Sequence, residues 1–288
     1  MKRSSLHEKE FTFLFLIFFL FLSCGVFMGL KLKIEQIPRK KIPGSSIIYI
    51  PSGKYLKFAT FGYSSLLADL IYIWAIQYYS DYSIQDRFNY LDHIFSIISE
   101  LDPRYTDPYE IGALIAVYEA KDMDLAFKIL DRGLEKNPDQ WLFPFEAGHL
   151  AQIVKKDYKL AMAYYKKASE IEGAPDITKR LYASAAFKTM DFKTSWETWL
   201  EIYQTVKDER IKKIASNHLY QVKATIDITA LKEAIGKFKA KYRRNPTDLS
   251  QLVKLGFLAS LPKDLDGKDY LYDSQKGEVT PPTIPWKR

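Results

Sequence analysis

The chain has 288 residues, a net charge of +7, 15% aromatic residues and a single cysteine. This length allows one or two domains with a sizeable core, and a lone cysteine excludes an internal disulfide or a cysteine-based metal site. No recognition motif accompanies the basic charge, so we expect no nucleic-acid partner.

Residues 1–30 contain an apolar run, Phe11–Leu30, that carries no charge over 20 residues. Such a run can cross ~30 Å of hydrocarbon as a helix, and it is longer than the apolar region of a typical cleaved signal peptide. We therefore expect an uncleaved, single-pass membrane anchor. Two alternatives stay open: a cleaved signal, and a lipoprotein signal in which Cys24 is lipidated, because the residues before Cys24 loosely resemble a lipobox.

The charges around the anchor give mixed information on its orientation. Lys2 and Arg3 before the apolar run are typical of an exported protein, although more basic residues follow the run than precede it. We expect the anchor to lie in a bacterial inner membrane with the body of the protein outside the cytoplasm. Residues 31–53 form a basic linker, rich in proline and glycine, in which Ser46–Ile50 could add a short strand.

Residues 54–206 contain a pattern that recurs every 34–35 residues and predicts about four helical hairpins. Large, small, large and small residues at offsets 0, 3, 7 and 10 lie on one face of a helix. The columns are Phe88, Met123, Tyr158 and Phe192; Leu91, Ala126, Ala161 and Ser195; Phe95, Leu130, Tyr165 and Trp199; and Ile98, Gly133, Ala168 and Ile202. A fixed period of this length is typical of stacked helical repeats, so the expected fold is all-α.

The boundaries of the repeats carry capping and stop signals. Asp122, Asp157 and Asp191 lie where a short side chain can cap the second helix of a hairpin, and Pro103 and Pro138 end helices in the same register. Spacing and residue types together resemble the tetratricopeptide repeat (TPR) family. This resemblance implies a right-handed superhelix with a concave, partner-binding groove.

Beyond the repeats, residues 207–244 predict one or two closing helices, and residues 245–288 predict a small α+β tail with a short helix and a hairpin. The tail weakly resembles the end of type II secretion pseudopilins, through Pro246–Val253 and Gly267–Tyr270. Leu66–Tyr79 and Leu101–Tyr105 resemble an uncharacterised group of bacterial membrane-anchored TPR proteins, a group that brings no catalytic residues with it.

The sequence carries no phosphate loop, zinc motif or nucleophile elbow, and its four histidines share no helix face or short spacing. We therefore expect no catalytic residues, no metal and no cofactor. The calcium-loop-like segment Asp264–Asp269 has its glycine in the wrong place, so we interpret it as an acidic turn.

The TPR-like register predicts that the first helix of each hairpin lines the groove. The expected partner-binding residues are Tyr118, Glu146, Leu150, Ile153, Arg180, Ser184, Phe187 and Lys188. A groove that is apolar at one end and basic at the other suits a protein or peptide partner with an acidic end. The hypothesis is a membrane-anchored scaffold, whose partner could belong to a pilus, secretion or export machine. The alternatives are an envelope enzyme or small-ligand-binding protein with a pocket between repeats and tail, and a structural spacer.

Overall fold

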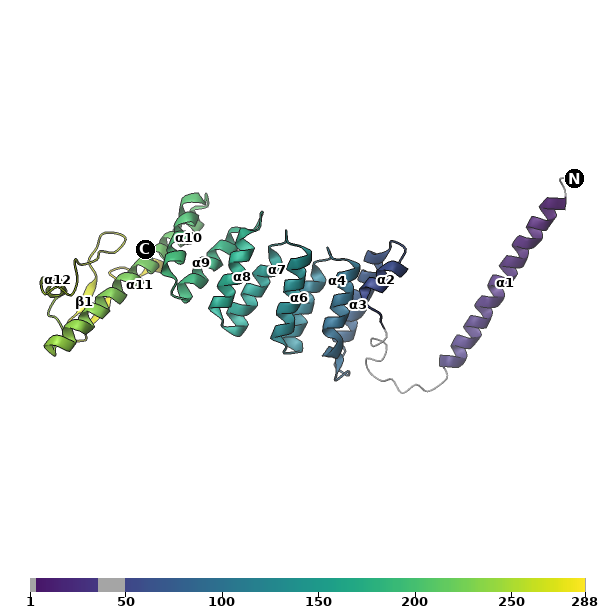
Figure 1. The fold of residues 1–288 in the computed structure, drawn as a ribbon, viewed down its shortest axis with the longest axis horizontal. Coiled ribbons are helices and arrows are strands. Elements are labelled where there is room, and N and C mark those ends of the chain that lie inside the picture. The colour runs from purple at the N-terminus through teal and green to yellow at the C-terminus, as the bar shows by residue number, and fades with distance from the viewer. Residues whose placement is uncertain (1–3, 36–49, 288) are drawn as a thin grey trace. The chain divides into compact units, whose positions relative to one another are not determined.

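The computed structural model describes residues 4–35 and 50–287, which are mostly helical with one small sheet near the C-terminus (Figure 1). They divide into two compact units. The first contains helix α1 (Ser4–Glu35) and the short segment Ser83–Arg87, and the second contains Pro51–Tyr82 and the chain from Phe88 onwards. The repeats therefore belong to the second unit.

Helix α1 carries the apolar run expected to form the membrane anchor. Its segment Phe13–Lys33 has 21 residues, a hydropathy of 2.6 and no buried residue in its most apolar window. At ~1.5 Å per residue, this segment matches the ~30 Å of a bilayer core. Length and composition therefore suit one membrane span.

The ends of the anchor differ in part from the expectation. The helix continues to Glu35, past the expected boundary at residue 30. Cys24 is exposed on this helix as a free thiol. The short strand predicted at Ser46–Ile50 lies outside the described residues, apart from Ile50.

Four helical hairpins follow one another in the second unit (Figure 1). In each hairpin a first helix packs against a second helix, and the second helix packs against the first helix of the next hairpin. The pairs are α3 (Ser64–Tyr79) with α4 (Leu91–Leu101), α5 (Asp107–Leu114) with α6 (Met123–Lys136), α7 (Leu142–Leu150) with α8 (Tyr158–Glu170), and α9 (Asp176–Lys188) with α10 (Phe192–Thr205). Before the hairpins, α2 (Gly53–Ala59) packs on α4. Inside the first hairpin, a 3-10 turn, η1 (Arg87–Tyr90), leads into α4.

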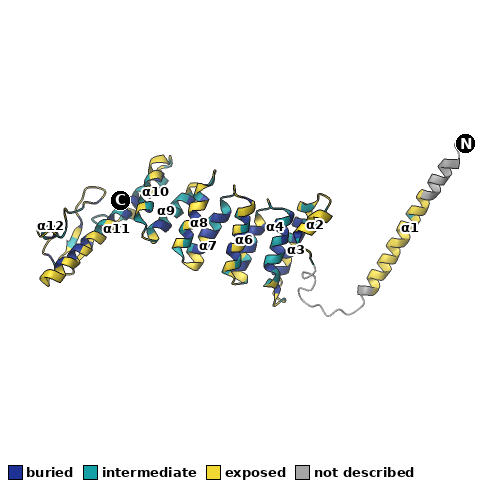
Figure 2. Cartoon of the chain, viewed as in Figure 1, coloured by how far each residue is buried: buried dark blue, intermediate teal, exposed yellow. Residues whose placement is uncertain are grey.

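The predicted columns form the interior of the hairpins, where buried residues alternate with an exposed outer surface (Figure 2). Every residue of the columns at offsets 3, 7 and 10 is buried, and the column at offset 0 is half-buried. Trp199 and Tyr165 of the offset-7 column are among the largest fully buried side chains. Because a buried large side chain contributes roughly 1.5–3 kcal/mol, these columns supply much of the packing energy between helices.

The turns inside the hairpins repeat one set of hydrogen bonds. Asp122, Asp157 and Asp191 each accept a bond through Oδ1 from the backbone N–H three residues later, at 2.9, 2.9 and 3.1 Å. The residue before each aspartate has a left-handed backbone, with φ of 59°, 60° and 64°. The predicted caps are confirmed, and each satisfies an N–H that a helix start would otherwise leave unpaired.

Two first helices end in a π-helical turn, which explains the uneven repeat period. Helix α5 continues as η2 (Ile115–Glu119) and α7 as η3 (Ala151–Lys155), whereas α9 ends without such a turn. After η3 the N–H of Asp157 donates to the carbonyl six residues earlier, but after α9 the N–H of Asp191 donates to the carbonyl five residues earlier. A π-turn accommodates one extra residue. Met123 and Tyr158, with η3 between them, are therefore 35 residues apart, whereas Tyr158 and Phe192, with α9 between them, are 34 residues apart.

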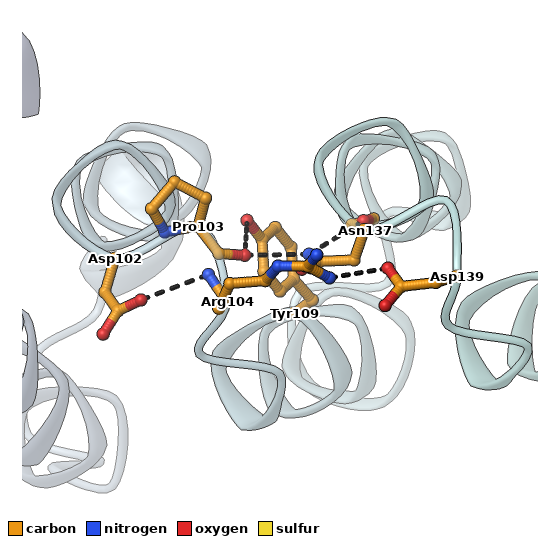
Figure 3. A network of polar contacts seen from close by, with 7 residues as sticks. Asp102, Pro103, Arg104, Tyr109, Asn137 and Asp139 are labelled. Carbon is orange, nitrogen blue, oxygen red and sulfur yellow. Dashed lines mark hydrogen bonds and ion pairs between the residues drawn. The ribbon is translucent and has the colours of Figure 1, made fainter.

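A polar network joins the turns between consecutive hairpins (Figure 3). The side chain of Asn137 is fully buried, and its Nδ2 donates to the carbonyl of Pro103 at 2.8 Å. The hydroxyl of Tyr109 donates to the same carbonyl at 3.2 Å. Arg104 donates through Nη1 to Asn137 at 3.4 Å and to Asp139 at 2.6 Å. The network therefore ties the turn after α4 to the turn after α6.

After the hairpins, residues 207–244 form one closing helix, α11 (Glu209–Tyr242), of 34 residues. The tail adds α12 (Ser250–Lys254), an antiparallel pair of strands and a final 3-10 turn. The strands are β1 (Leu271–Asp273) and β2 (Glu278–Thr280), and the turn is η4 (Pro285–Lys287). The predicted helix and hairpin are therefore both present.

Apolar packing and two hydrogen bonds, one buried and one part-buried, hold the tail on α11. A buried cluster fills the interface and includes Tyr220, Leu231, Phe238, Leu252, Tyr270 and Val279. The hydroxyl of Tyr220 donates to Asp264 at 2.9 Å, and that of Tyr270 donates to Asp227 at 2.7 Å. Asp264 also accepts the backbone N–H groups of Asp266 and Lys268, so the segment interpreted as an acidic turn is a turn held by its own aspartate.

Candidate functional site

A cavity of about 110 Å³ lies between α5, α6 and α7. The first helices α5 and α7 form two of its walls, and α6 contributes one residue. Its lining residues are Glu110, Ala113, Leu114, Leu130, Glu146 and Leu150. Two of these residues, Glu146 and Leu150, belong to the predicted groove.

The two walls carry the same short sequence pattern, which the sequence analysis missed. Residues 110–114 read EIGAL and residues 146–150 read EAGHL, so that Glu-x-Gly-x-Leu recurs after 36 residues. Glutamate and leucine four positions apart share one helix face, and both pairs line the cavity. The 34–35-residue period belongs to the second helices, and the pattern of the first helices shows only when they are aligned at 36 residues.

The glycine of each pattern allows a neighbouring helix to pack closely behind the wall. A Cβ on Gly112 would lie 2.8 Å from the ring of Phe95, and a Cβ on Gly148 would lie 2.7 Å from the ring of Tyr165. Atoms at those separations overlap, so a larger residue at either position would require the neighbouring aromatic ring to move. The walls of the cavity are therefore fixed by the buried aromatic column of the second helices.

In the described chain, no ion pair neutralises the two carboxylates of the cavity. Among the described residues, neither Glu110 nor Glu146 forms an ion pair or accepts a hydrogen bond. Burial raises the pKa of both, and the carboxylates of Glu146 and Asp107 raise that of Glu110 further. His149 opposes the shift of Glu146. The site is thus negative and only partly solvated.

The hydroxyl of Tyr165, which is influenced by the charge of Glu146, also lacks a hydrogen-bond partner among the described residues. Tyr165 is fully buried, and its hydroxyl has no hydrogen-bond partner in the described part of the chain. Burial raises the pKa of Tyr165, and the charge of Glu146 raises it further. Tyr165 lies close behind the wall of the cavity, because its ring would be 2.7 Å from a Cβ on Gly148.

Exposed apolar side chains continue along the same two helices. Leu114 and Tyr118 on α5 and η2 are 41% and 53% exposed, and Ile153 and Val154 on η3 are 47% and 39% exposed. Glu110, Leu114 and Tyr118 follow one another at intervals of four residues. Large apolar groups rarely gather on a surface without a binding role, so the cavity and this rim form one candidate site.

The predicted groove residues on α9 form a different environment. Lys188 is exposed, whereas Arg180, Ser184 and Phe187 are half-buried. Phe187 packs on Phe192 with ring centroids 5.6 Å apart, so much of its surface serves the hairpin. Arg180 makes no ion pair in the described residues, and its buried Nε has no partner.

The remaining predicted groove residues divide between surface and core. Tyr118 and Ile153 are exposed, Glu146 is half-buried and Leu150 is only 5% exposed. Leu150 therefore contributes to the wall of a cavity and not to an open surface. The structure brings Glu146 and Leu150 together with Glu110, Leu114 and Leu130, which the sequence analysis had not selected.

No group of three or more His, Cys, Asp or Glu residues in the described chain could hold a metal ion. Comparison with known proteins adds no relatives: no protein-family model matches the chain, and no curated protein matches it.

Proposed function

We propose that this protein is a membrane-anchored helical-repeat scaffold that binds a protein or peptide partner along its first helices. The observation that carries the proposal is the cavity between α5 and α7, which combines two unpaired carboxylates with an exposed apolar rim. An extended peptide that carries both apolar and charged side chains supplies both complements to such a surface.

The cost of this surface to the protein supports a binding role. Half-buried carboxylates without a partner favour the neutral form and destabilise the charged folded state. Exposed leucine, isoleucine, valine and tyrosine side chains do not add to the core. A surface that is unfavourable in the free protein and becomes satisfied on binding is typical of an interaction site.

The proposed fold is a right-handed TPR-like superhelix with the first helices on its concave side. The period, the buried columns and the capped turns support this assignment. In such a stack, adjacent first helices lie side by side and form a continuous groove, and α5 and α7 are in contact.

The proposed location is a bacterial inner membrane, with α1 as a single-pass anchor and the body outside the cytoplasm. Anchoring would raise the effective concentration of the groove near a membrane-bound partner. The weak likeness of the tail to pseudopilins favours a partner from a pilus, secretion or export machine.

The alternative of an enzyme or small-ligand-binding protein required a pocket between the repeats and the tail. The apolar cluster around Phe238 and Tyr270 fills the interface of α11 with the tail, and the cavity with the unpaired carboxylates lies instead between the repeat helices. This position of the cavity favours the scaffold.

Photo-crosslinking in producing cells tests the proposal. A photoreactive amino acid at Tyr118 on the rim should give one dominant protein adduct. The same amino acid at Ala163, which is exposed on the second helix α8, should not give this adduct. Adducts that are absent from Tyr118 and Ile153, or equal at Ala163, would contradict groove binding and favour a structural spacer.

A further inference from the structure

The cavity between α5 and α7 has the size of one side chain. Its volume of about 110 Å³ corresponds to a few water molecules at ~30 Å³ each. Pockets for cofactors and drug-sized ligands are usually larger, at ~300–1,000 Å³. The cavity can therefore accommodate a single extended side chain of a larger partner, but not a whole cofactor.

The lining divides into an apolar part and an anionic part. Ala113, Leu114, Leu130 and Leu150 supply hydrocarbon, and Glu110 and Glu146 supply the only charged groups of the lining. A metal ion such as Ca²⁺ would require six to eight oxygen ligands, which two carboxylates among leucines do not provide. Lysine and arginine match the lining better, because each has a hydrocarbon stem and a cationic end.

We infer that the cavity receives a lysine or arginine side chain of an extended peptide, whose neighbouring apolar residues lie on Leu114, Tyr118, Ile153 and Val154. The cationic end pairs with Glu110 and Glu146, and the stem contacts the leucines. This inference rests on the proposed function and reverses the charge expected for the partner, since the predicted contact at Arg180 and Lys188 called for an acidic end.

The two carboxylates are suited to this role because they have no other partner in the described chain. A cation that enters the cavity does not have to displace an existing ion pair. In contrast, Asp92 on α4 already forms ion pairs with Lys128 and Arg132 at 2.6 Å each. The unpaired hydroxyl of Tyr165 behind the wall adds a further polar group near Glu146.

The test is a selection of random heptapeptides, displayed on phage, against the full-length chain in detergent. The same selection is run on the double variant Glu110→Gln/Glu146→Gln. A matched control is Glu172→Gln/Glu197→Gln, which removes two exposed carboxylates elsewhere and changes the net charge equally. Circular dichroism confirms that all three proteins are folded.

The wild type and the control should enrich peptides that carry one lysine or arginine between apolar residues. The double variant should bind an enriched peptide at least about tenfold more weakly, because charge-assisted contacts are lost. Enriched basic peptides that bind the double variant equally well would overturn the inference alone. Enriched acidic peptides that depend on Arg180 and Lys188 would also overturn it while leaving groove binding intact. No enrichment on any of the proteins would count against the proposed function itself.

Discussion

Asn137 is the residue on which two consecutive hairpins depend most directly. It is fully buried and donates to the carbonyls of Pro103 and Gly133 at 2.8 and 3.1 Å. Asn137→Ala should lower the free energy of unfolding by about 1–3 kcal/mol, because buried polar groups lose their partner. Urea denaturation followed by circular dichroism measures the change.

The ion pair next to Asn137 provides the control. Asp139 is 59% exposed where it meets Arg104, and solvent-exposed ion pairs contribute little. Asp139→Ala should therefore leave the unfolding midpoint almost unchanged. Equal losses for the two variants would show that the buried amide is not what joins the hairpins.

Glu146 should make the stability of the protein depend on pH. Burial raises its pKa in the folded state above the ordinary value of 4.5. Below the ordinary value both states are protonated and the group has no effect. As pH rises, the unfolded chain ionises first, so the free energy of unfolding falls until the folded-state pKa is passed. Above the folded-state pKa, Glu146 is charged in both states, and its partly buried carboxylate destabilises the folded protein at neutral pH.

Glu146→Gln should therefore flatten this fall and raise the free energy of unfolding at pH 7. The charged and titratable neighbours of Glu146 are Glu110, His149 and Tyr165. Urea titrations between pH 4 and pH 8 measure the effect, and Glu172→Gln at an exposed position serves as the control. A variant that follows the wild-type pH profile would show that Glu146 is better solvated than the structure indicates.

At the scale of helices, the sequence was sufficient for the second helix of each hairpin. Its buried face follows a 3.6-residue period with strong size alternation, and Leu91, Ala126, Ala161 and Ser195 are all buried as predicted. The aspartate caps and the prolines marked the ends. These features are local, so a single sequence contains them.

The first helices were harder to predict because their register differs from that of the second helices. The extra residue in η3 gives a backbone bond over six residues and is not encoded by a distinctive residue such as glycine or proline. The wall residues Glu110 and Glu146 are 36 residues apart, outside the period that the buried columns follow. The α7 wall was predicted through Glu146 and Leu150, whereas Glu110 and Leu114 of the α5 wall were not.

The π-turn η3 should be removable without loss of the fold. Deleting Lys155, which is exposed, would shorten the connection to that of α9, whose turn closes on Asp191 without a π-segment. The cap at Asp157 and helix α8 should persist, so the unfolding midpoint should change little. Ile153 and Val154 precede the deleted residue and keep their register on α7, so the crosslink from Tyr118 should persist as well.

A second deletion provides the contrasting case. Removing Lys166, also exposed but inside α8, would rotate Ala168 out of the buried column while Ala161 and Tyr165 stay in it. This variant should unfold or lose most of its stability. If deletion of Lys155 were as damaging as deletion of Lys166, the π-turn would be a structural requirement.

For the whole molecule, the arrangement that matters is the side of the membrane on which the groove lies. The apolar segment Phe13–Lys33 is long enough for one span, and a single span leaves the N-terminus and the body on opposite sides. Charge counts around the segment are ambiguous, because basic residues lie before and after it. A direct measurement of sidedness is therefore needed.

Single-cysteine labelling in spheroplasts provides that measurement. The natural thiol is first removed by Cys24→Ser, and a new one is introduced by Glu172→Cys in the exposed turn between α8 and α9. With the body outside the cytoplasm, a membrane-impermeant maleimide should label this cysteine in intact spheroplasts. A cysteine introduced by Ser5→Cys, before the apolar segment, should be labelled only after lysis. The opposite pattern would place the groove in the cytoplasm, where its partner could not be an extracytoplasmic part of a secretion or pilus machine. Labelling of both cysteines in intact spheroplasts would show that α1 does not span the membrane, and the proposal of a single-pass anchor would be wrong.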